Sequence, residues 1–399
     1  MSSSRLSVVM FSALLSHGGG RETWLNNVLP ELLSLRAFDQ IDVYYVADAS
    51  TDMHPKIGIC VDPRVNFFET RLPVGNGKLT SIRRIGLFCA DVVRRLRRQP
   101  PVGHCVVAVG TFYEGAILAL LRATSRRPPV LVTWIRGIWS KEINHRHGPL
   151  TRNLICSFEK LFMRSAHRII SNGQDTKVFY EALLARHVEA IPNALDIQKY
   201  AAFSRQAFAE KCKTVSFIGR LSEEKGLRAY LDAIATYFSA HESSTLSFEI
   251  VGDGPLRELV EQFLAKYSER PVRYLGPISN ENMLPYLETI DAGVCLTYSK
   301  ESGGGGVSNG LLELIGAGRL VIAWDSPIYK QVLDCDQALF IEESDIAALS
   351  QGFAKLDTDA MALRTKITCS ATVLERYSLE QHVRHFVTYV SSCSVPTWA

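Results

Sequence analysis

The sequence predicts an α/β protein with two doubly wound domains, each a parallel sheet covered by helices on both faces. Short β-rich apolar segments alternate with helical patterns along nearly the whole chain. Its 399 residues, 47% hydrophobic and 21% charged, suffice for two domains with cores of ordinary size. A polar stretch at 193–213 separates two runs of this alternation.

The first half of the chain carries six candidate strands, with helical patterns between most of them. Arg5 and the apolar run that ends at Leu15 resemble a short signal peptide. The glycine-rich segment 17–20 follows instead of a small-x-small cleavage site, which favours a buried strand that ends in a loop. We expect strands at 5–11, 41–47, 104–110, 130–135, 167–171 and 187–191, and helices at 77–98, 112–124, 150–165 and 174–184.

The second half repeats the alternation of strands and helices and ends in an amphipathic helix. The last pattern, Ser378 to Val390, places apolar residues at i, i+4 and i+7 spacing from Leu379. We therefore expect domains at 1–195 and 196–375 and a closing helical segment at 376–399. The candidate strands of the second domain are 214–218, 246–251, 272–275, 291–296 and 320–324.

Charge divides the chain into unlike halves. Residues 1–195 carry 25 Lys/Arg against 15 Asp/Glu, a net charge of +10, whereas the whole chain carries only +3. The second half is therefore acidic, and the two halves are expected to meet different ligands. Helix 77–98 has apolar residues on one side and arginines on the other. It fits an anionic membrane or a lipid-diphosphate acceptor, or a core-packed helix with a solvated basic face.

The nine cysteines stand singly, with no C-x-x-C pair. Metal-ligand spacing is therefore absent, and scattered thiols are typical of a reducing cytoplasm. No apolar run approaches the roughly 20 residues of a membrane-spanning helix. We expect a cytoplasmic protein. Peripheral contact with the inner face of the membrane is compatible with this expectation.

The segment 219–226, Gly-Arg-Leu-Ser-Glu-Glu-Lys-Gly, is the most informative in the chain. It follows strand 214–218, so Arg220 and Lys225 stand at the carboxyl end of a strand, where open α/β sheets bind ligands. A guanidinium forks two phosphate oxygens and an ammonium acts as a point charge. The pair suits a diphosphate, and the plainer interpretation is a solvated basic turn.

Two glycine turns accompany this segment. Residues 252–255, Gly-Asp-Gly-Pro, end a strand and open a helix, as any strand–helix junction can. Four glycines at 303–306 precede a helical run that contains Glu313. Glycines let the backbone approach an anion, and a carboxylate on that helix could accept both hydroxyls of a ribose. The alternative is a flexible linker.

Together these segments resemble the retaining GT-B glycosyltransferases of the family-four group (glycosyl transferases group 1), over almost the whole chain. The resemblance rests on Gly19-Gly20-Arg21-Glu22, on Pro192-Asn193-Ala194-Leu195-Asp196, on 219–226, on 252–255 and on the glycine–helix run from Gly305 to Gly318. It implies two Rossmann-like domains with parallel sheets facing across a cleft, and a C-terminal helix that crosses back to the N-terminal domain.

The resemblance also implies roles for individual residues. Arg220 and Lys225 would grip the donor's diphosphate and neutralise the leaving group, and Glu313 would hold the nucleotide ribose. The first domain would bind the acceptor and the second the nucleotide sugar. The remaining expected contacts to the nucleotide sugar are Gly19, Gly20, Gly219, Gly252, Gly306, Val307 and Asn309.

Two positions depart from the family's pattern. Gly305 stands where the family has a first glutamate that grips the donor sugar, and Glu301 is out of register with it. Arg136 stands where members often have a histidine after strand 130–135; it would meet phosphate or an acidic acceptor, or be a surface arginine. His17, before the glycine loop, is a further candidate for acceptor or donor contact, or a loop histidine without a role.

The expected reaction is metal-independent and uses no cofactor. A nucleotide sugar, UDP-linked rather than GDP-linked, would give its sugar with retention to a hydroxyl acceptor, in polysaccharide or other envelope glycan assembly. The acceptor would be a sugar, a lipid-linked glycan or a small molecule; the basic first domain would supply any peripheral membrane contact, and nucleic acid is not expected. The alternatives are a non-catalytic nucleotide-binding protein and a sugar-nucleotide epimerase of the same fold.

Overall fold

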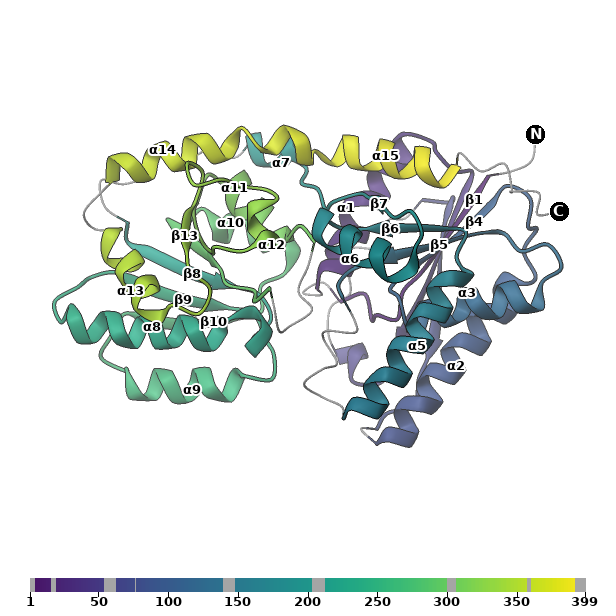
Figure 1. The fold of residues 1–399 in the computed structure, drawn as a ribbon, viewed down its shortest axis with the longest axis horizontal. Coiled ribbons are helices and arrows are strands. Elements are labelled where there is room, and N and C mark those ends of the chain that lie inside the picture. Colours follow the sequence, from purple (N-terminus) through teal and green to yellow (C-terminus); the bar gives the residue numbers. More distant parts are fainter. Residues whose placement is uncertain are drawn as a thin grey trace. The chain divides into compact units, whose positions relative to one another are not determined.

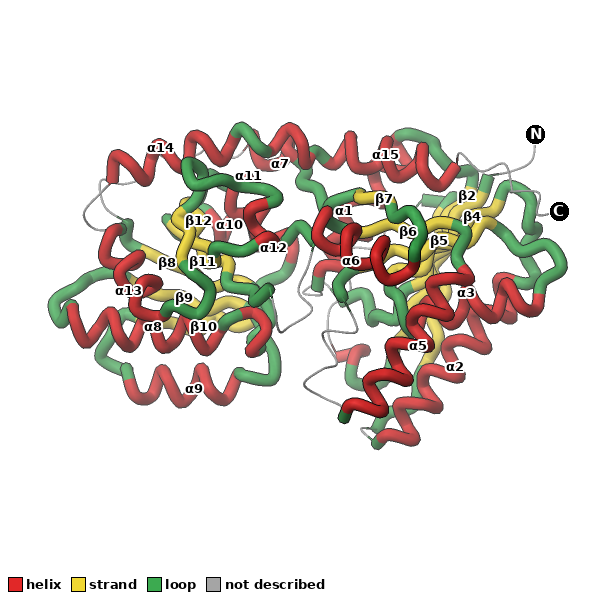
Figure 2. Tube along the Cα trace, viewed as in Figure 1, coloured by secondary structure: helices red, strands yellow, loops and turns green. Residues whose placement is uncertain are grey.

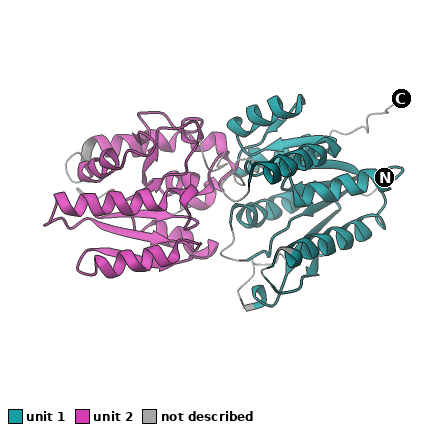
Figure 3. Cartoon of the chain, turned by 60° about the horizontal axis from the view of Figure 1, so that its bottom comes forward, with its two compact units in different colours: residues 1–192, 379–399 teal, residues 193–378 magenta. Residues whose placement is uncertain are grey.

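The computed structural model divides the chain into two compact units (Figure 3). Unit 1 comprises residues 1–192 and 379–399, and unit 2 comprises residues 193–378. The residues that the structure describes are 4–15, 19–53, 62–75, 77–138, 148–202, 212–299, 306–356 and 360–391.

Unit 1 is built on a parallel sheet of seven strands in the order β3-β2-β1-β4-β5-β6-β7. Its central strands are buried on both faces and rich in valine, as fully covered parallel strands require. The parallel α/β prediction is confirmed. The strands are β1 (Arg5–Val9), β2 (Gln40–Ala47), β3 (Val65–Arg71), β4 (His104–Val109), β5 (Val130–Ile135), β6 (Arg168–Ser171) and β7 (Glu189–Ala190).

Helices cover both faces of this sheet (Figures 1 and 2). Alternate residues of β1 face opposite cores: Val8 packs in the cluster that contains α1, and Val9 in the cluster that contains α2, α3, α5 and α6. The bounds are α1 (Gly20–Ser34), α2 (Lys78–Leu96), α3 (Tyr113–Thr124), α5 (Pro149–Ser165) and α6 (Gln174–Leu184), with a 3₁₀ turn η1 (Thr51–Met53).

The closing helix α15 (Leu379–Ser391) returns to unit 1 and packs against α1. Trp24 Nε1 donates to His382 Nε2 at 3.0 Å, and His382 Nδ1 donates to the Pro192 carbonyl at 2.7 Å. Burial lowers the pKa of His382 to about 4, so the ring is neutral and one nitrogen can accept while the other donates. The return of the last helix to the first domain is confirmed.

Unit 2 has a parallel sheet of six strands in the order β10-β9-β8-β11-β12-β13. The sequence predicted the five strands β8 to β12 and did not predict β13. The strands are β8 (Thr214–Ile218), β9 (Ser247–Val251), β10 (Val272–Gly276), β11 (Ala292–Cys295), β12 (Leu320–Trp324) and β13 (Leu339–Ile341). The helices are α7 (Ile197–Ala202), α8 (Leu227–Ala240), α9 (Arg257–Lys266), α10 (Asn280–Leu287), α11 (Asn309–Gly316), α12 (Pro327–Lys330), α13 (Ile346–Lys355) and α14 (Ala360–Ala371), with 3₁₀ turns η2 (Glu223–Lys225) and η3 (Leu374–Tyr377).

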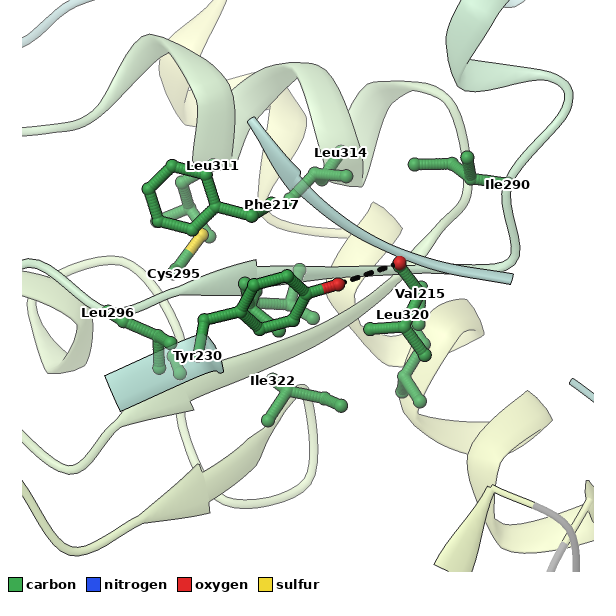
Figure 4. Packing of buried hydrophobic residues seen from close by; sticks show 14 of the residues in the cluster. Val215, Phe217, Tyr230, Ile290, Cys295, Leu296, Leu311, Leu314, Leu320 and Ile322 are labelled. Atoms are coloured by element: carbon green, nitrogen blue, oxygen red, sulfur yellow. Dashed lines mark hydrogen bonds between the residues drawn. The ribbon is translucent and has the colours of Figure 1, made fainter. Parts of the chain in front are cut away.

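One continuous apolar core fixes the strands of unit 2 to their helices. Tyr230 on α8 is fully buried and donates its hydroxyl to the Val215 carbonyl of β8 at 2.9 Å (Figure 4). Leu311 and Leu314 bring α11 into the same core. The loops that follow these strands are therefore carried on a rigid base.

Candidate functional site

The candidate site of unit 2 lies at the carboxyl edge of its sheet. Because all six strands are parallel, the loops after β8, β9, β11 and β12 leave from the same edge. The segment 219–226 follows β8 and the turn 252–255 follows β9. Such an edge is where ligands bind in doubly wound sheets.

Backbone hydrogen bonds join the loops after β8 and β9. Gly219 N–H donates to the Val251 carbonyl at 3.0 Å, and Leu221 N–H donates to the Asp253 carbonyl at 3.0 Å. Gly252 has φ +130°, and a Cβ there would lie 1.8 Å from the Gly219 carbonyl oxygen. Only glycine allows this approach, so the two sequence motifs form one preorganised backbone unit.

Arg220 lies in the loop after β8, and its side chain is exposed. No ion pair or hydrogen bond of its guanidinium is found within the described residues. Glu223, three residues further along the chain, pairs with Arg228, with Nη2 to Oε1 at 2.6 Å. Arg220 is thus an exposed cation at the carboxyl edge of the sheet.

Lys225 is half-buried at the end of η2, and its position is fixed by the backbone on both sides. Gly226 has φ +72°, and a Cβ there would collide with the Leu296 carbonyl; Tyr298 N–H donates to the Glu224 carbonyl at 3.1 Å. The Lys225 Nζ lies 3.4 Å from Thr297 Oγ1. Its positive charge therefore lies beside the segment after β11.

Helix α11 begins at the same edge, after Gly306 and Val307, which are buried. The Asn193 side-chain amide donates to the Val307 carbonyl at 2.6 Å and holds this turn in place. Ser308, the N-cap residue, makes no side-chain cap hydrogen bond. The first-turn N–H groups, which include that of Asn309, are left for water or an anion, since no intrahelical acceptor exists for them.

Glu313 lies four residues further along α11 and is half-buried. Desolvation raises the pKa of this carboxyl to about 7, and the charge of Lys199 on α7 lowers it by a smaller amount. A half-buried carboxylate has lost part of its hydration, so its charged form is unfavourable without a partner. Hydrogen-bond donors of a ligand would therefore stabilise it more than they would stabilise an exposed carboxylate.

Three buried donors at the ends of β8 and β12 have no hydrogen-bond partner within the described residues. They are Ser222 Oγ, Trp324 Nε1 and Ser326 Oγ. Trp324 stacks on Tyr298, with ring centroids 6.1 Å apart. Unsatisfied buried polar groups are rare in folded proteins, and these three end or follow strands of unit 2 at the carboxyl edge, which is consistent with a polar ligand there.

In unit 1 the glycine loop begins α1 at the carboxyl end of β1. Gly19 is the N-cap residue and Gly20 the first helical residue. Arg21 donates to the buried Glu114 at 2.6 Å, and Glu114 also accepts from the Phe11 N–H at 2.9 Å. The start of α1 is therefore held to α3 and to the end of β1 through one carboxylate.

Arg136, after β5, is half-buried rather than a simple surface arginine. Its Nη2 donates to the Gly20 carbonyl at 3.0 Å, and its guanidinium lies 5.4 Å from the Trp134 ring centroid. Desolvation lowers the pKa of Arg136, with a smaller contribution from Arg21. The structure thus gives Arg136 a role in holding the glycine loop, while its contact with a ligand stays a prediction.

Other sequence-based candidates have no described position. His17, Gly305 and Glu301 lie outside the described residues. Sequence reasoning assigned no role to Asn193, Thr297 or Glu114, which position the site. Asn193 was visible within the Pro-Asn-x-x-Asp motif, whereas the other two carried no local signal.

Within the described ranges, no three or more His, Cys, Asp or Glu residues are grouped so that they could hold a metal ion. In the same part of the chain, no helix combines the length and apolarity needed to cross a membrane.

Three comparisons relate this chain to known proteins. Residues 212–359 match the family model of the glycosyl transferases group 1. A 2-deoxystreptamine glucosyltransferase of Streptomyces kanamyceticus is 26% identical over 170 residues, which span 39% of this chain and 43% of that protein's length. The crystal structure of HepE from Anabaena in complex with UDP and glucose superposes with a TM-score of 0.72 at 16% identity, over 97% of this chain and 99% of that one.

WaaG, described as a glycosyltransferase involved in lipopolysaccharide biosynthesis, is similar to the same extent. Its TM-score is 0.71 at 14% identity, over 97% of this chain and 100% of the other. At these identities the structural likenesses establish the fold alone. They confirm the expected arrangement of two Rossmann-like parallel sheets in one chain.

Proposed function

Because residues 212–359 match the family model of the glycosyl transferases group 1 and the chain has the GT-B fold, we propose that it is a retaining, metal-independent glycosyltransferase. Its donor is a nucleotide diphosphate sugar, and its acceptor presents a hydroxyl. The observation that carries the proposal is the rigid backbone unit that presents Arg220 and Lys225 at the carboxyl edge of the second sheet.

Donor binding would use the cations together with the start of α11. Arg220 and Lys225 take the diphosphate, and the N–H groups around Gly306, Val307 and Asn309 add hydrogen bonds to phosphate or sugar. Glu313 accepts the ribose hydroxyls. The likeness to a structure described with UDP and glucose supports UDP over GDP, and the glucosyltransferase of Streptomyces kanamyceticus supports a hexose.

The chemistry follows from the movement of charge. The bond from the sugar's anomeric carbon to the diphosphate oxygen breaks, and its electron pair stays on the phosphate. The acceptor oxygen bonds to the same carbon from the same face, and its proton passes to a phosphate oxygen. Preorganised cations stabilise the departing diphosphate, and positioning supplies much of the remaining rate enhancement. No protein nucleophile is needed.

The first unit would bind the acceptor. It is the basic half of the chain, which suits an acidic or phosphate-bearing acceptor. A sugar, a lipid-linked glycan or a small molecule fits this role, and the likeness to a glycosyltransferase involved in lipopolysaccharide biosynthesis supports envelope glycan assembly. The proposed place of this assembly is the cytoplasm, with peripheral contact at the membrane.

One sequence observation favours a second class of function. Gly305 replaces the glutamate that grips the donor sugar in the family's pattern, which is consistent with a protein that binds nucleotide without transferring sugar. A sugar-nucleotide epimerase of the same fold would instead convert the donor sugar without any acceptor.

A panel of UDP- and GDP-sugars, with and without lipid-linked and soluble acceptors, separates these functions. We expect one UDP-sugar to be consumed only when an acceptor is present, with the sugar recovered on the acceptor. Raised melting temperatures with no sugar release for any donor would favour the binding protein. Conversion of the donor sugar in the absence of acceptor would identify the epimerase.

A further inference from the structure

Exposed apolar side chains gather on one helix layer of unit 1. Among the described residues, twelve large hydrophobic side chains are exposed, and eight of them lie on α2, α3 and α5, of which α3 contacts both others. This concentration marks a surface for interaction rather than a random scatter. The eight are Leu79, Ile82, Leu87, Leu120, Leu150, Leu154, Phe158 and Leu161.

On α5 the apolar residues form a stripe that faces solvent. Leu150, Leu154, Phe158 and Leu161 follow one another at spacings of four, four and three residues, and therefore share a face. The buried residues of α5 are Glu159 and Met163, on the opposite side. The helix thus presents its apolar stripe outward, which is the reverse of an ordinary surface helix.

Helix α2 shows the same feature at its start. Phe88 and Val92 are buried in the core. Ile82, which is also apolar, is 67% exposed, and Leu79 is 83% exposed. The first half of α2 therefore extends beyond the core with bare apolar side chains.

The same layer carries the charge of the whole first half. Segments 78–98, 113–127 and 149–165 contain 13 Lys/Arg and 3 Asp/Glu, a net charge of +10, equal to that of residues 1–195. The three carboxylates do not offset this charge at the surface. Glu114 and Glu159 are buried, and the half-buried Asp91 accepts from Arg94 and Arg95.

We propose that this layer, the α2/α5 surface, docks on an anionic lipid bilayer. Its exposed leucines and isoleucine enter the headgroup–acyl boundary, and its arginines and lysines meet the anionic headgroups. Each contribution alone gives weak binding, and stable attachment needs both. The charge has one sign, which complements a lipid surface of the opposite sign over its whole extent.

The position of the most exposed side chains connects this surface with the ligand edge of unit 1. Leu79 and Leu150, 83% and 85% exposed, lie in the first turns of α2 and α5. Both helices follow parallel strands, so their first turns lie at the carboxyl edge of the sheet. Where the proposed sugar transfer holds, this arrangement favours an acceptor that is anchored in the membrane.

Co-sedimentation of the full chain with vesicles tests the surface directly. Vesicles of phosphatidylcholine alone are compared with vesicles that contain about a third phosphatidylglycerol. We expect the protein to pellet only with the anionic vesicles, and to be released by salt, since a Debye length of about 3 Å at 1 M screens surface charges. Equal binding to both vesicle types, or binding to neither, would overturn the proposal.

Matched variants assign the binding to this face. Leu150→Ser with Leu154→Ser, and separately Arg83→Glu, should each weaken binding to anionic vesicles by roughly tenfold or more. The controls are Leu275→Ser and Lys266→Glu, an exposed leucine and a lysine of unit 2, which should leave binding unchanged. Equal losses in the variants and the controls would contradict the assignment.

Two further measurements make a negative result decisive. Far-UV circular dichroism melting should be unchanged in all variants, because the substituted side chains are exposed. Sedimentation velocity reports self-association: a dimer that the α5 double variant disrupts, without vesicle binding by the wild type, would show that a second copy of the chain covers the surface instead. Vesicle binding needs no sugar transfer, so its failure leaves the donor proposal standing.

Discussion

The carboxyl edges of the two sheets use their cations differently. In unit 1, Arg21 is paired with the buried Glu114 and Arg136 donates to the Gly20 carbonyl, so both hold the start of α1. In unit 2, Arg220 has no ion pair within the described residues, and Lys225 lies beside Thr297. Cations at the carboxyl edge of unit 1 thus hold the backbone in place, whereas those of unit 2 are the ones that we propose for ligand binding.

The largest expected effect is on turnover when the cations of unit 2 are removed. Arg220→Ala and Lys225→Ala should each lower kcat by 100- to 1000-fold, roughly 3 kcal/mol of transition-state stabilisation, with the fold intact. Steady-state transfer assays and melting curves measure both quantities. Lys266→Ala, on α9, is the matched control and should transfer sugar normally. Near-normal rates in both site variants would show that neither Arg220 nor Lys225 stabilises the transition state.

In unit 1 we expect the opposite outcome, a loss of stability when a cation is removed. Arg21→Ala leaves the buried Glu114 without its cation and should lower the free energy of unfolding by about 2 kcal/mol, because an uncompensated buried charge is costly. Urea unfolding measures the loss. Arg257→Ala breaks an exposed pair with Glu261 and should leave the free energy of unfolding nearly unchanged, because solvent screens exposed ion pairs. Equal losses in the two variants would refute the structural role of Arg21.

A tenfold effect on nucleotide affinity is expected at Asn193. Asn193→Ala removes the hydrogen bond to the Val307 carbonyl and should loosen the turn before α11, which weakens UDP binding by about tenfold. Calorimetric titration with UDP provides the measurement. Asn66→Ala removes a side-chain hydrogen bond to Asp42 in unit 1 and serves as the control. Unchanged affinity in Asn193→Ala would show that the turn does not bind the donor.

The smallest expected effect is a pH-dependent change at Glu313. The pKa of Glu313 is raised from 4.5 to about 7 in the folded state. The contribution of this carboxyl to the free energy of unfolding therefore falls as the pH rises from 4.5 to 7, and the loss is complete above pH 7. Glu313→Gln cannot ionise. It should be more stable than the wild type by on the order of 1 kcal/mol at pH 8 and equal near pH 4.5.

The same variant should bind nucleotide more weakly at pH 8, because it lacks the charged acceptor for the ribose. Melting curves and UDP titrations across pH 4.5–8 separate the two effects. A variant whose stability and affinity both follow the wild type at every pH would contradict the environment and the role assigned to Glu313.

Much of the fold could be predicted from the sequence because buried parallel strands leave a strong local signal. Val106 and Val107 lie in an unbroken apolar run, and the helices between strands keep their period. Strand β3 was not predicted, because Asn66 and Glu69 interrupt its apolar residues at the edge of the sheet. Strand β13 has only three residues and lies at the other edge.

The site was predictable where a motif is local and unpredictable where contacts are distant. Arg220, Lys225 and Gly252 stand in short motifs after strands, and the structure brings their loops together. The contact of Asn193 with Val307 spans 114 positions and left no pattern in either segment. The hydrogen bond from Arg136 to the Gly20 carbonyl likewise spans 116 positions.

Calorimetric titration of UDP and of uridine into the wild type and into Arg220→Ala with Lys225→Ala tests the diphosphate assignment most directly. We predict that the wild type binds UDP far more tightly than uridine. The double variant should lose about 100-fold in UDP affinity, as two charge-assisted contacts imply, and keep its affinity for uridine. An unchanged preference for UDP in the double variant would contradict the assignment.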